Sequence, residues 1–515
     1  MKARIFSPAM VPVSVATDSY KQTHYEMYPA ARVMSAYVEA RTPFEKGEDE
    51  RVVCYGLQYF VERWLMQQWT EADVQAAEQF YATFNAGNTN HPFPRDLFLK
   101  FVRENQGWFP VRVQGLRDGT VCYVHTPQLV FTTTGEYARL VTWLETVGLQ
   151  TIWYMSTVAT LSRLVVQSIQ DAFDASVDDS ARWKLRSRFH DFGFRGCTST
   201  EQAIMGGAAH LLNSDGTDTC AAAWYAQYWC NGGKPVGSSI PATEHSVMTS
   251  HERELDGVRF IVGKFAHGVF ATVADSYDYT RFLNEILPQI AQDVKSAGGF
   301  HVVRPDSGDP TACVLEGLRA LEHAYGTTTN AKGYRVINGA GIIQGDGIDR
   351  HNVRTILKAV MDAGYSAENV AFGMGAGLLQ KVNRDTLGYA MKLSYVEQLD
   401  GRERHIMKLP KTDMRKASLP GLFHVQRDWF DKETGVHVPR VYPAETTAAH
   451  AGPNLLETVW DCGPVGYEFD SFDEVRNRVD TEWNGLPPSL AGGAISDPMT
   501  TKRNKIADQI RATPV

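Results

Sequence analysis

The sequence predicts an α/β protein that combines an irregular (β/α) barrel-like domain with an α+β domain built from the N- and C-terminal parts. From about residue 185 to 395, short apolar runs end in Gly- and Asp-rich turns, and amphipathic helical segments follow them. Such repeated strand-turn-helix units imply parallel strands with crossover helices. Residues 85–135 instead carry short strands punctuated by Asn, Gly and Pro, which is typical of a β-rich module.

Length and composition narrow the possibilities further. A chain of 515 residues is too long for one simple core, and a net charge of −8 argues against general nucleic-acid binding. The sequence offers no apolar window of membrane-spanning length and no signal peptide, so we expect no membrane association. Seven scattered cysteines without a C-x-x-C pair favour reduced thiols, no zinc site and a cytoplasmic location.

The elements follow in order along the chain. We expect domains at 1–180 and 181–390, and a C-terminal segment, 391–515, that packs with the first. Capping patterns at Thr70–Asp73 and Thr198–Glu201, and the pair Asp309-Pro310, predict helix starts. The other expectations are a strand over 36–41, helices over 54–84, 138–175 and 353–363, and a frayed tail after Asp497.

Charged residues recur in the turns that follow the predicted strands. A barrel of strand-turn-helix units places its chemistry on the loops after the strands. Five side chains fall there, namely Arg195, Asp275, Arg304, Asp306 and Asp346. For any one position, Asp as simple turn punctuation is a serious alternative, but five such turns together favour a site.

The stretch from Arg188 to Ser246 concentrates candidate groups. Phe192 and Arg195 could hold a flat ring and an anion, or they could be a core strand and an ion-paired arginine. Asp218 could accept a hydrogen bond from a ligand amide, or it could cap the next helix. His245 needs a carboxylate partner for any chemical role, and Asp275 is a candidate; a surface histidine is the alternative.

Glycines follow a later predicted strand, in Gly373-Met-Gly375-Ala-Gly377. A backbone turn of this kind at a helix N-terminus can cradle phosphate. Its spacing matches neither a dinucleotide fingerprint nor a Walker loop, so sites of those two kinds are not indicated.

These motifs resemble those of the nicotinate/nicotinamide phosphoribosyltransferase family. They keep their order and spacing across about residues 15 to 480. The matching stretches are Thr17-Asp-Ser-Tyr-Lys-Gln-Thr-His-Tyr, Tyr55-Gly-Leu-Gln-Tyr, His190-Asp-Phe-Gly-Phe-Arg-Gly, Gly216-Thr-Asp-Thr, Ile240-Pro-Ala-Thr-Glu-His-Ser, Asp275-Ser-Tyr-Asp, Arg304-Pro-Asp-Ser-Gly, Ile343-Gln-Gly-Asp-Gly-Ile-Asp, Gly377-Leu-Leu-Gln-Lys and Lys392-Leu-Ser-Tyr.

The resemblance implies the barrel-like fold of type II phosphoribosyltransferases and a homodimer with shared active sites. It implies that Phe192 and Tyr20, from different subunits, stack on a pyridine ring and that Asp218 selects its amide. Departures are Phe194, where the family often has tyrosine, and Met374 and Ala376 in a serine-glycine-rich loop. The remaining residues implied or predicted to bind substrate are Arg41, Arg195, Ser239, Arg304, Gly345, Asp346, Gly375, Ala376, Arg384, Lys392 and Lys416.

The resemblance also implies a reaction. Nicotinamide and phosphoribosyl pyrophosphate would give nicotinamide mononucleotide and pyrophosphate in NAD salvage, with Mg²⁺ as cofactor and ATP as co-substrate. His245 would accept a phosphoryl group from ATP, Asp275 would orient it, and Asp306 completes the catalytic set. Two alternatives stay open here: a nicotinate phosphoribosyltransferase, and a non-catalytic binding protein on the same scaffold.

Overall fold

The computed structural model describes residues 11–87, 89, 91–410, 417–433, 435–446 and 452–512. The chain forms two compact units. Unit 1 comprises the chain up to Thr157, then Asn383–Asp470 and the residues from Glu474 onward, whereas unit 2 comprises Val158–Val382 and Ser471–Asp473. Helix α5 (Glu145–Ser176) belongs to both units.

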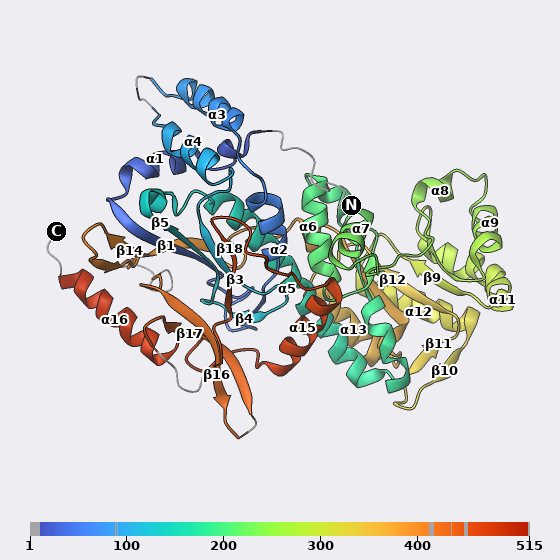
Figure 1. Ribbon diagram of the computed structural model, residues 1–515. Helices are drawn as coiled ribbons and strands as arrows, with labels where there is room; N and C mark the ends of the chain where they lie inside the picture. Colours follow the sequence, from blue (N-terminus) through green and yellow to red (C-terminus); the bar gives the residue numbers. More distant parts are fainter. Residues whose placement is uncertain are drawn as a thin grey trace. The chain divides into compact units, whose positions relative to one another are not determined.

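Unit 2 is built on a sheet of parallel strands in the order β7-β6-β13-β12-β9-β8. Helix α11 packs against β9, α12 packs against β11 and β12, and α13 packs against α12 (Figure 1). The elements are β6 (Phe189–Asp191), α6 (Thr200–Leu211), β7 (Gly216–Thr217), α7 (Cys220–Trp224), α8 (His245–Thr249), α9 (Glu254–Phe265), β8 (Val269–Val273), α10 (Tyr279–Arg281), α11 (Leu287–Ala297), β9 (Phe300–Arg304), α12 (Pro310–Tyr325), β10 (Thr327–Thr329), β11 (Arg335–Ile337), β12 (Ala340–Gln344), α13 (Asn352–Asp362), β13 (Val370–Met374) and α14 (Ala376–Leu379).

A short segment, 238–243, links the two edge strands of this sheet. At one end, Ser238 forms a parallel bridge with Gly216 of β7. At the other end, Ala242 forms a parallel bridge with Ala271 of β8. Backbone groups at both edges are therefore paired, which closes the sheet into a barrel-like ring and confirms the predicted fold class.

Helix starts in unit 2 follow local capping chemistry. Asp309 accepts a hydrogen bond from the Ala312 N–H at 2.8 Å, and Pro310 occupies the first helical turn of α12, as predicted. The cap of α6 differs from the prediction by one residue. Ser199, not Thr198, accepts from the Gln202 N–H, because the helix begins at Thr200.

Unit 1 contains an antiparallel sheet in the order β15-β14-β1-β5-β3-β18, which joins strands from both ends of the chain. The elements are α1 (Ser19–Met27), β1 (Ala31–Glu39), β2 (Arg51–Val53), α2 (Leu57–Phe60), α3 (Glu71–Thr83), α4 (Arg95–Glu104), β3 (Arg112–Leu116), β4 (Val121–Tyr123), β5 (Pro127–Thr134), β14 (Ala390–Gln398), β15 (Glu403–His405), β16 (Phe423–Asp431), β17 (Val436–Pro443), β18 (Leu456–Asp461), α15 (Phe472–Gly485) and α16 (Asp497–Ala512). The expected frayed tail is instead the regular helix α16, anchored by buried Met499 and Ala507.

A buried carboxylate starts helix α2. Asp118 accepts hydrogen bonds from the N–H groups of Gly56, Leu57 and Gln58 at 2.7 to 3.0 Å, so it satisfies donors that the helix itself cannot. Burial raises the pKa of this carboxyl group to about 6.

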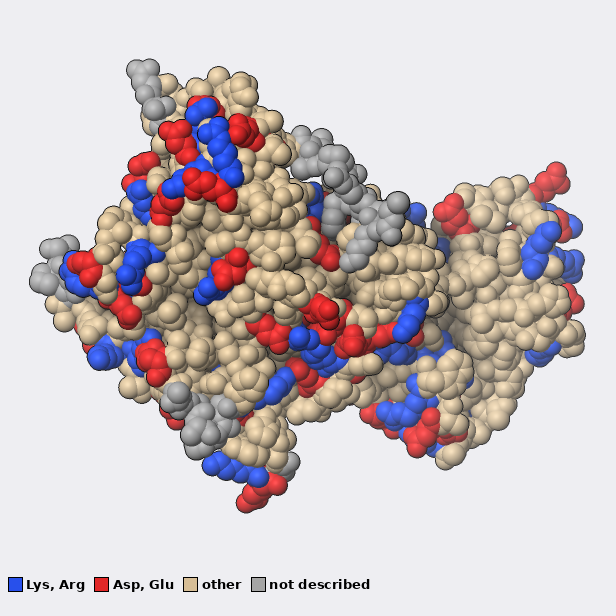
Figure 2. All heavy atoms as spheres, viewed as in Figure 1, with Lys and Arg blue, Asp and Glu red and all other residues tan. Residues whose placement is uncertain are grey.

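The surface mixes both signs of charge. Over α3 and α4, Arg95 and Arg103 pair with Glu78 and Glu71, and Figure 2 shows basic and acidic side chains interspersed on that region. Within the described ranges, no helix combines the length and the apolar character that crossing a bilayer requires.

Candidate active site

The barrel of unit 2 encloses a cavity of about 300 Å³. Alternate residues of β8 and β9, and of the segment that leads through β6, line it, as expected for side chains that point to one face of a strand. Small side chains at Ala271 and Ala371, together with Gly341, leave the interior open rather than filled. The strand residues and their immediate neighbours along the wall are Arg188, His190, Phe192, Val269, Ala271, Phe300, Val302, Arg304, Gly341, Ile342, Ile343, Asn369 and Ala371.

Phe192 lies at the carboxyl end of this cavity, directly after β6. Its N–H donates to the Met374 carbonyl at 3.0 Å, which holds it beside β13. A Cβ at Gly373 would lie 2.0 Å from the Phe192 ring, so only glycine leaves room for the ring there. Phe192 is therefore an aromatic wall of the cavity, not a filled core position.

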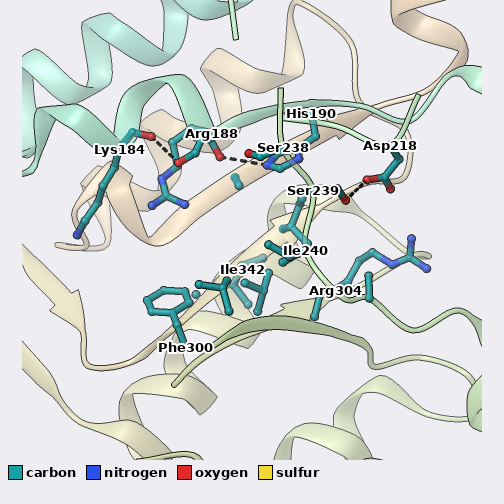
Figure 3. A pocket seen from close by; sticks show the side chains of 18 of the residues that line it. Lys184, Arg188, His190, Asp218, Ser238, Ser239, Ile240, Phe300, Arg304 and Ile342 are labelled. Atoms are coloured by element: carbon teal, nitrogen blue, oxygen red, sulfur yellow. Dashed lines mark hydrogen bonds between the residues drawn. The ribbon is translucent and has the colours of Figure 1, made fainter. Parts of the chain in front are cut away.

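Asp218 points into the same end of the cavity from the turn between β7 and α7 (Figure 3). The Ser239 hydroxyl donates to its Oδ1 at 2.6 Å. The alternative role as a helix cap does not hold, because Thr219 is the N-cap of α7 and no side chain caps that helix. The carboxylate instead lines the cavity that the Phe192 ring also lines.

His245 begins helix α8 and is held on both sides of its ring. Its Nδ1 lies 3.0 Å from Ser276 Oγ, and its Nε2 lies 3.2 Å from Asp306 Oδ2. A carboxylate only accepts, so Nε2 carries the proton and Nδ1 accepts from the Ser276 hydroxyl. Arg304, which also lines the cavity, lies 3.6 Å from the same Asp306 oxygen.

Asp275 does not orient His245 directly, and this corrects the prediction. Its Oδ2 accepts from the Asp306 N–H at 3.1 Å and from the Ser307 hydroxyl. Asp275 thereby fixes the loop that carries Asp306, and Asp306 contacts the imidazole. Both carboxylates follow neighbouring parallel strands, β8 and β9, whose carboxyl ends lie at one edge of the sheet.

These carboxylates fit a hard cation. Asp275 Oδ1 is buried and has no hydrogen-bond partner among the described residues. The same part of the chain holds no cluster of three or more potential metal ligands. Mg²⁺ commonly binds one or two carboxylates together with substrate phosphates and water. Asp275 and Asp306 are therefore suited to a Mg²⁺ ion that arrives with a phosphate substrate.

The remaining predicted residues of unit 2 lie at the carboxyl ends of strands without lining the cavity. Arg195, Asp346 and Ala376 are exposed, whereas Gly345 and Gly375 are partly exposed. Gly345 lies close to the Phe192 ring, since a Cβ there would be 3.1 Å from it. Gly375 precedes the four-residue helix α14, so the glycine-rich turn follows β13 as predicted.

Unit 1 holds the other predicted residues, and the charges of some of them shift the pKa values of others. Tyr20 projects from α1 with 52% of its surface exposed. Partial burial, Glu145 and Asp18 raise the pKa of Tyr20, and Arg384 opposes that rise. Burial and then Arg41 lower the pKa of Lys392. Lys416 lies outside the described residues.

The strand alternation also reveals cavity residues that the motif analysis did not select. Arg188 and His190 precede Phe192 at intervals of two and line the same wall (Figure 3). Burial lowers the pKa of Arg188 to about 10 and lowers the pKa of His190 below its usual value. The motif analysis also did not select Ser276, the hydrogen-bond partner of His245. Its position next to Asp275 in the sequence could have identified it.

Comparison with known proteins matches two family models. The nicotinate phosphoribosyltransferase (NAPRTase) family model covers residues 187–442. The model for the nicotinamide phosphoribosyltransferase N-terminal domain covers residues 12–113.

Two relatives that match over nearly their whole length have the same protein name. A nicotinamide phosphoribosyltransferase of Xanthomonas campestris pv. campestris is 38% identical over 474 residues, covering 90% of this chain and 97% of that protein. A nicotinamide phosphoribosyltransferase of Acinetobacter baylyi is 30% identical over 517 residues, covering 90% and 96%.

Solved structures support the fold alone. Human nicotinic acid phosphoribosyltransferase superposes with a TM-score of 0.62 at 18% identity, over 95% of this chain and 99% of that one. A nicotinate-nucleotide pyrophosphorylase from Pyrococcus furiosus gives a TM-score of 0.61 at 15% identity, over 94% and 99%.

Proposed function

Because the chain belongs to the nicotinamide phosphoribosyltransferase family of pentosyltransferase enzymes, we propose that it forms nicotinamide mononucleotide. The substrates are nicotinamide and phosphoribosyl pyrophosphate, the second product is pyrophosphate, and the reaction serves NAD salvage.

The observation that carries this proposal is that the Asp218 carboxylate and the Phe192 ring line the same cavity. Its Oδ1 is occupied by Ser239, and Oδ2 remains to accept a hydrogen bond from the carboxamide NH₂ of nicotinamide. Nicotinate would instead present a second carboxylate. Two like charges about 4 Å apart repel by about 1 kcal/mol in water and about 4 kcal/mol at an effective dielectric constant of 20. This difference favours the amide.

The proposed catalysis depends on the placement of the pyridine ring and on groups that balance the charge of the phosphates. Phe192 stacks on the pyridine ring, which is worth about 0.5–1.5 kcal/mol beyond buried area, and holds its nitrogen toward the ribose. Arg304 is the cavity cation at that end of the barrel and suits the ribose phosphate. Asp275 and Asp306 would hold Mg²⁺, which neutralises charge that develops on the departing pyrophosphate.

ATP is the proposed co-substrate, and His245 its phosphoryl acceptor. The Nε2 proton is held by Asp306, and the Nδ1 lone pair becomes the nucleophile when the Ser276 hydroxyl releases it. The bond from the γ-phosphorus to the bridging oxygen breaks, an N–P bond forms, and ADP leaves. Asp306 balances the positive charge on the ring, and phosphorylation couples ATP hydrolysis to tighter substrate binding.

The proposal includes a cytoplasmic homodimer with shared active sites. Tyr20 is an exposed ring on a helix that is anchored through the buried ion pair of Lys21 with Glu145. Such a ring suits stacking on a ligand bound by another copy of the chain. Arg384 is close enough to Tyr20 to affect its pKa, and Arg41 is close enough to Lys392 to affect the pKa of that lysine. These three cations suit the phosphate groups. The seven free cysteines accord with a reducing compartment.

The test is direct. Purified protein is incubated with phosphoribosyl pyrophosphate, Mg²⁺ and either nicotinamide or nicotinate, and each mononucleotide is quantified by chromatography. We expect nicotinamide to be used with the higher kcat/KM. A higher kcat/KM for nicotinate would assign the chain to the nicotinate reaction instead.

A further inference from the structure

A second carboxyl group lies behind the pyridine end of the cavity. Asp191 is the last residue of β6, directly before Phe192, and its side chain is 0% exposed. It does not line the cavity and has no place in the chemistry described above.

Asp191 connects the two turns that carry Phe192 and Asp218. Its Oδ1 accepts a hydrogen bond from the Gly193 N–H at 2.7 Å, immediately after Phe192. Its backbone carbonyl accepts from the Asp218 N–H at 2.9 Å. One residue therefore holds both groups that are expected to contact nicotinamide.

The carboxyl group is tightly enclosed by glycines. A Cβ at Gly193 would lie 3.1 Å from Oδ1, and a Cβ at Gly207 would lie 3.1 Å from Oδ2. A side chain at either glycine would therefore press on the carboxyl group. The space around the carboxyl group is thus narrow on both sides.

Burying this group is unfavourable for folding. Burial raises the pKa of Asp191 to about 6, Asp218 adds to the rise, and the hydrogen bond from the Gly193 N–H opposes it. Its Oδ2 and the buried Thr219 Oγ1 have no hydrogen-bond partner within the described ranges. A buried carboxylate without a cation is costly, which indicates that the group is retained for a purpose other than stability.

We propose that Asp191 is a positioning residue for pyridine binding, whose carboxyl group and carbonyl together set the places of Phe192 and Asp218. The inference rests on the proposed function, because it assigns Asp191 to the nicotinamide site. Asp191 acts through these two residues and does not touch the substrate.

The experiment compares Asp191→Asn with Asp191→Leu in steady-state kinetics. Asn keeps an oxygen that accepts from the Gly193 N–H, whereas Leu has the same branching and the same number of side-chain heavy atoms but no acceptor. A lost hydrogen bond to a buried donor predicts that Leu raises the KM for nicotinamide about tenfold. The Asn variant stays within about threefold of wild type, and the KM for phosphoribosyl pyrophosphate changes less than about twofold in both.

Controls separate positioning from stability. Tyr365→Phe removes a partly buried hydrogen bond elsewhere in unit 2, from the Tyr365 hydroxyl to Glu322, and should lower the melting temperature without changing either KM. If the Leu variant does not fold, Asp191→Glu replaces it, because its extra methylene displaces the carboxyl group within the narrow space beside Gly193 and Gly207. The Glu variant is then judged by the same changes in the KM values for nicotinamide and phosphoribosyl pyrophosphate.

Three results would overturn the proposal. One is a folded Leu or Glu variant with an unchanged KM for nicotinamide. The second is an equal rise in both KM values, and the third is an Asn variant as impaired as Leu. A wild-type protein that makes no nicotinamide mononucleotide would refute the proposed function itself, so the two failures are distinguishable.

Discussion

Replacing Gly373 by alanine should damage nicotinamide binding without touching the substrate. Gly373 lies in β13 beside the Phe192 ring, and an added Cβ would lie 2.0 Å from Cε2 and 2.2 Å from Cδ2 of that ring. Ordinary contact begins near 3.4 Å, so the ring edge has to move by about 1.4 Å. Movement of β13 is restricted because it pairs with β6 and β12 on its two sides.

Two costs follow from this displacement. Overpacking of a filled position destabilises a protein by about 1–3 kcal/mol. Misplacing a group that positions the substrate by about 1 Å can lower the rate about a hundredfold. We therefore expect kcat/KM for nicotinamide to fall by about 10- to 100-fold in Gly373→Ala.

The assay measures initial rates of pyrophosphate release against nicotinamide concentration, with thermal melting to check folding. Gly263→Ala is the matched control, because Gly263 lies in helix α9 with nothing within 4 Å of the added Cβ. That variant should keep wild-type kinetics and gain up to about 1 kcal/mol of helix stability. A folded Gly373→Ala enzyme with the kinetics of Gly263→Ala would refute the assigned role of the Phe192 ring.

Further outcomes are expected at four other positions. Asp218→Asn should lower the ratio of kcat/KM for nicotinamide to that for nicotinate about tenfold or more, measured with both substrates. His245→Ala should keep basal turnover and lose ATP stimulation; equal stimulation would refute the phosphoryl-acceptor role. The pKa of Asp118 is raised from 3.8 to about 6, so its contribution to stability falls as pH rises from about 4 to 6. Asp118→Asn should flatten that part of a melting-temperature profile. His24 contacts the Tyr20 ring edge-to-face at 5.1 Å, so His24→Leu should raise the nicotinamide KM about threefold and His24→Phe should not.

Sequence reasoning placed charged residues at the strand ends of unit 2 correctly, because strands and turns are locally encoded. Asp275 follows β8, Arg304 ends β9 and Asp346 follows β12, as the apolar runs and Gly/Asp turns predicted. The partner of His245 could not be chosen in the same way. Asp275 and Asp306 both follow neighbouring strands, and the register of those strands decides which carboxylate reaches the imidazole.

Other features depend on contacts between distant parts of the chain. Strand β1 pairs with β14 across more than 350 residues, and no local pattern encodes that partnership. Helix α16 has few buried apolar residues, so its sequence has weak helical periodicity and resembled a frayed tail. No local sequence pattern indicated the role of Asp191 either, because that role depends on two turns that meet only in the folded unit.

The central claim is that this cavity joins nicotinamide to a ribose phosphate and selects the amide through Asp218. The most direct measurement is a competition assay with equal nicotinamide and nicotinate, limiting phosphoribosyl pyrophosphate, and wild-type or Asp218→Asn protein. The account predicts mainly nicotinamide mononucleotide from the wild type and a more even mixture from the variant. Mainly nicotinate mononucleotide from the wild type, or the same product ratio from both proteins, would contradict it.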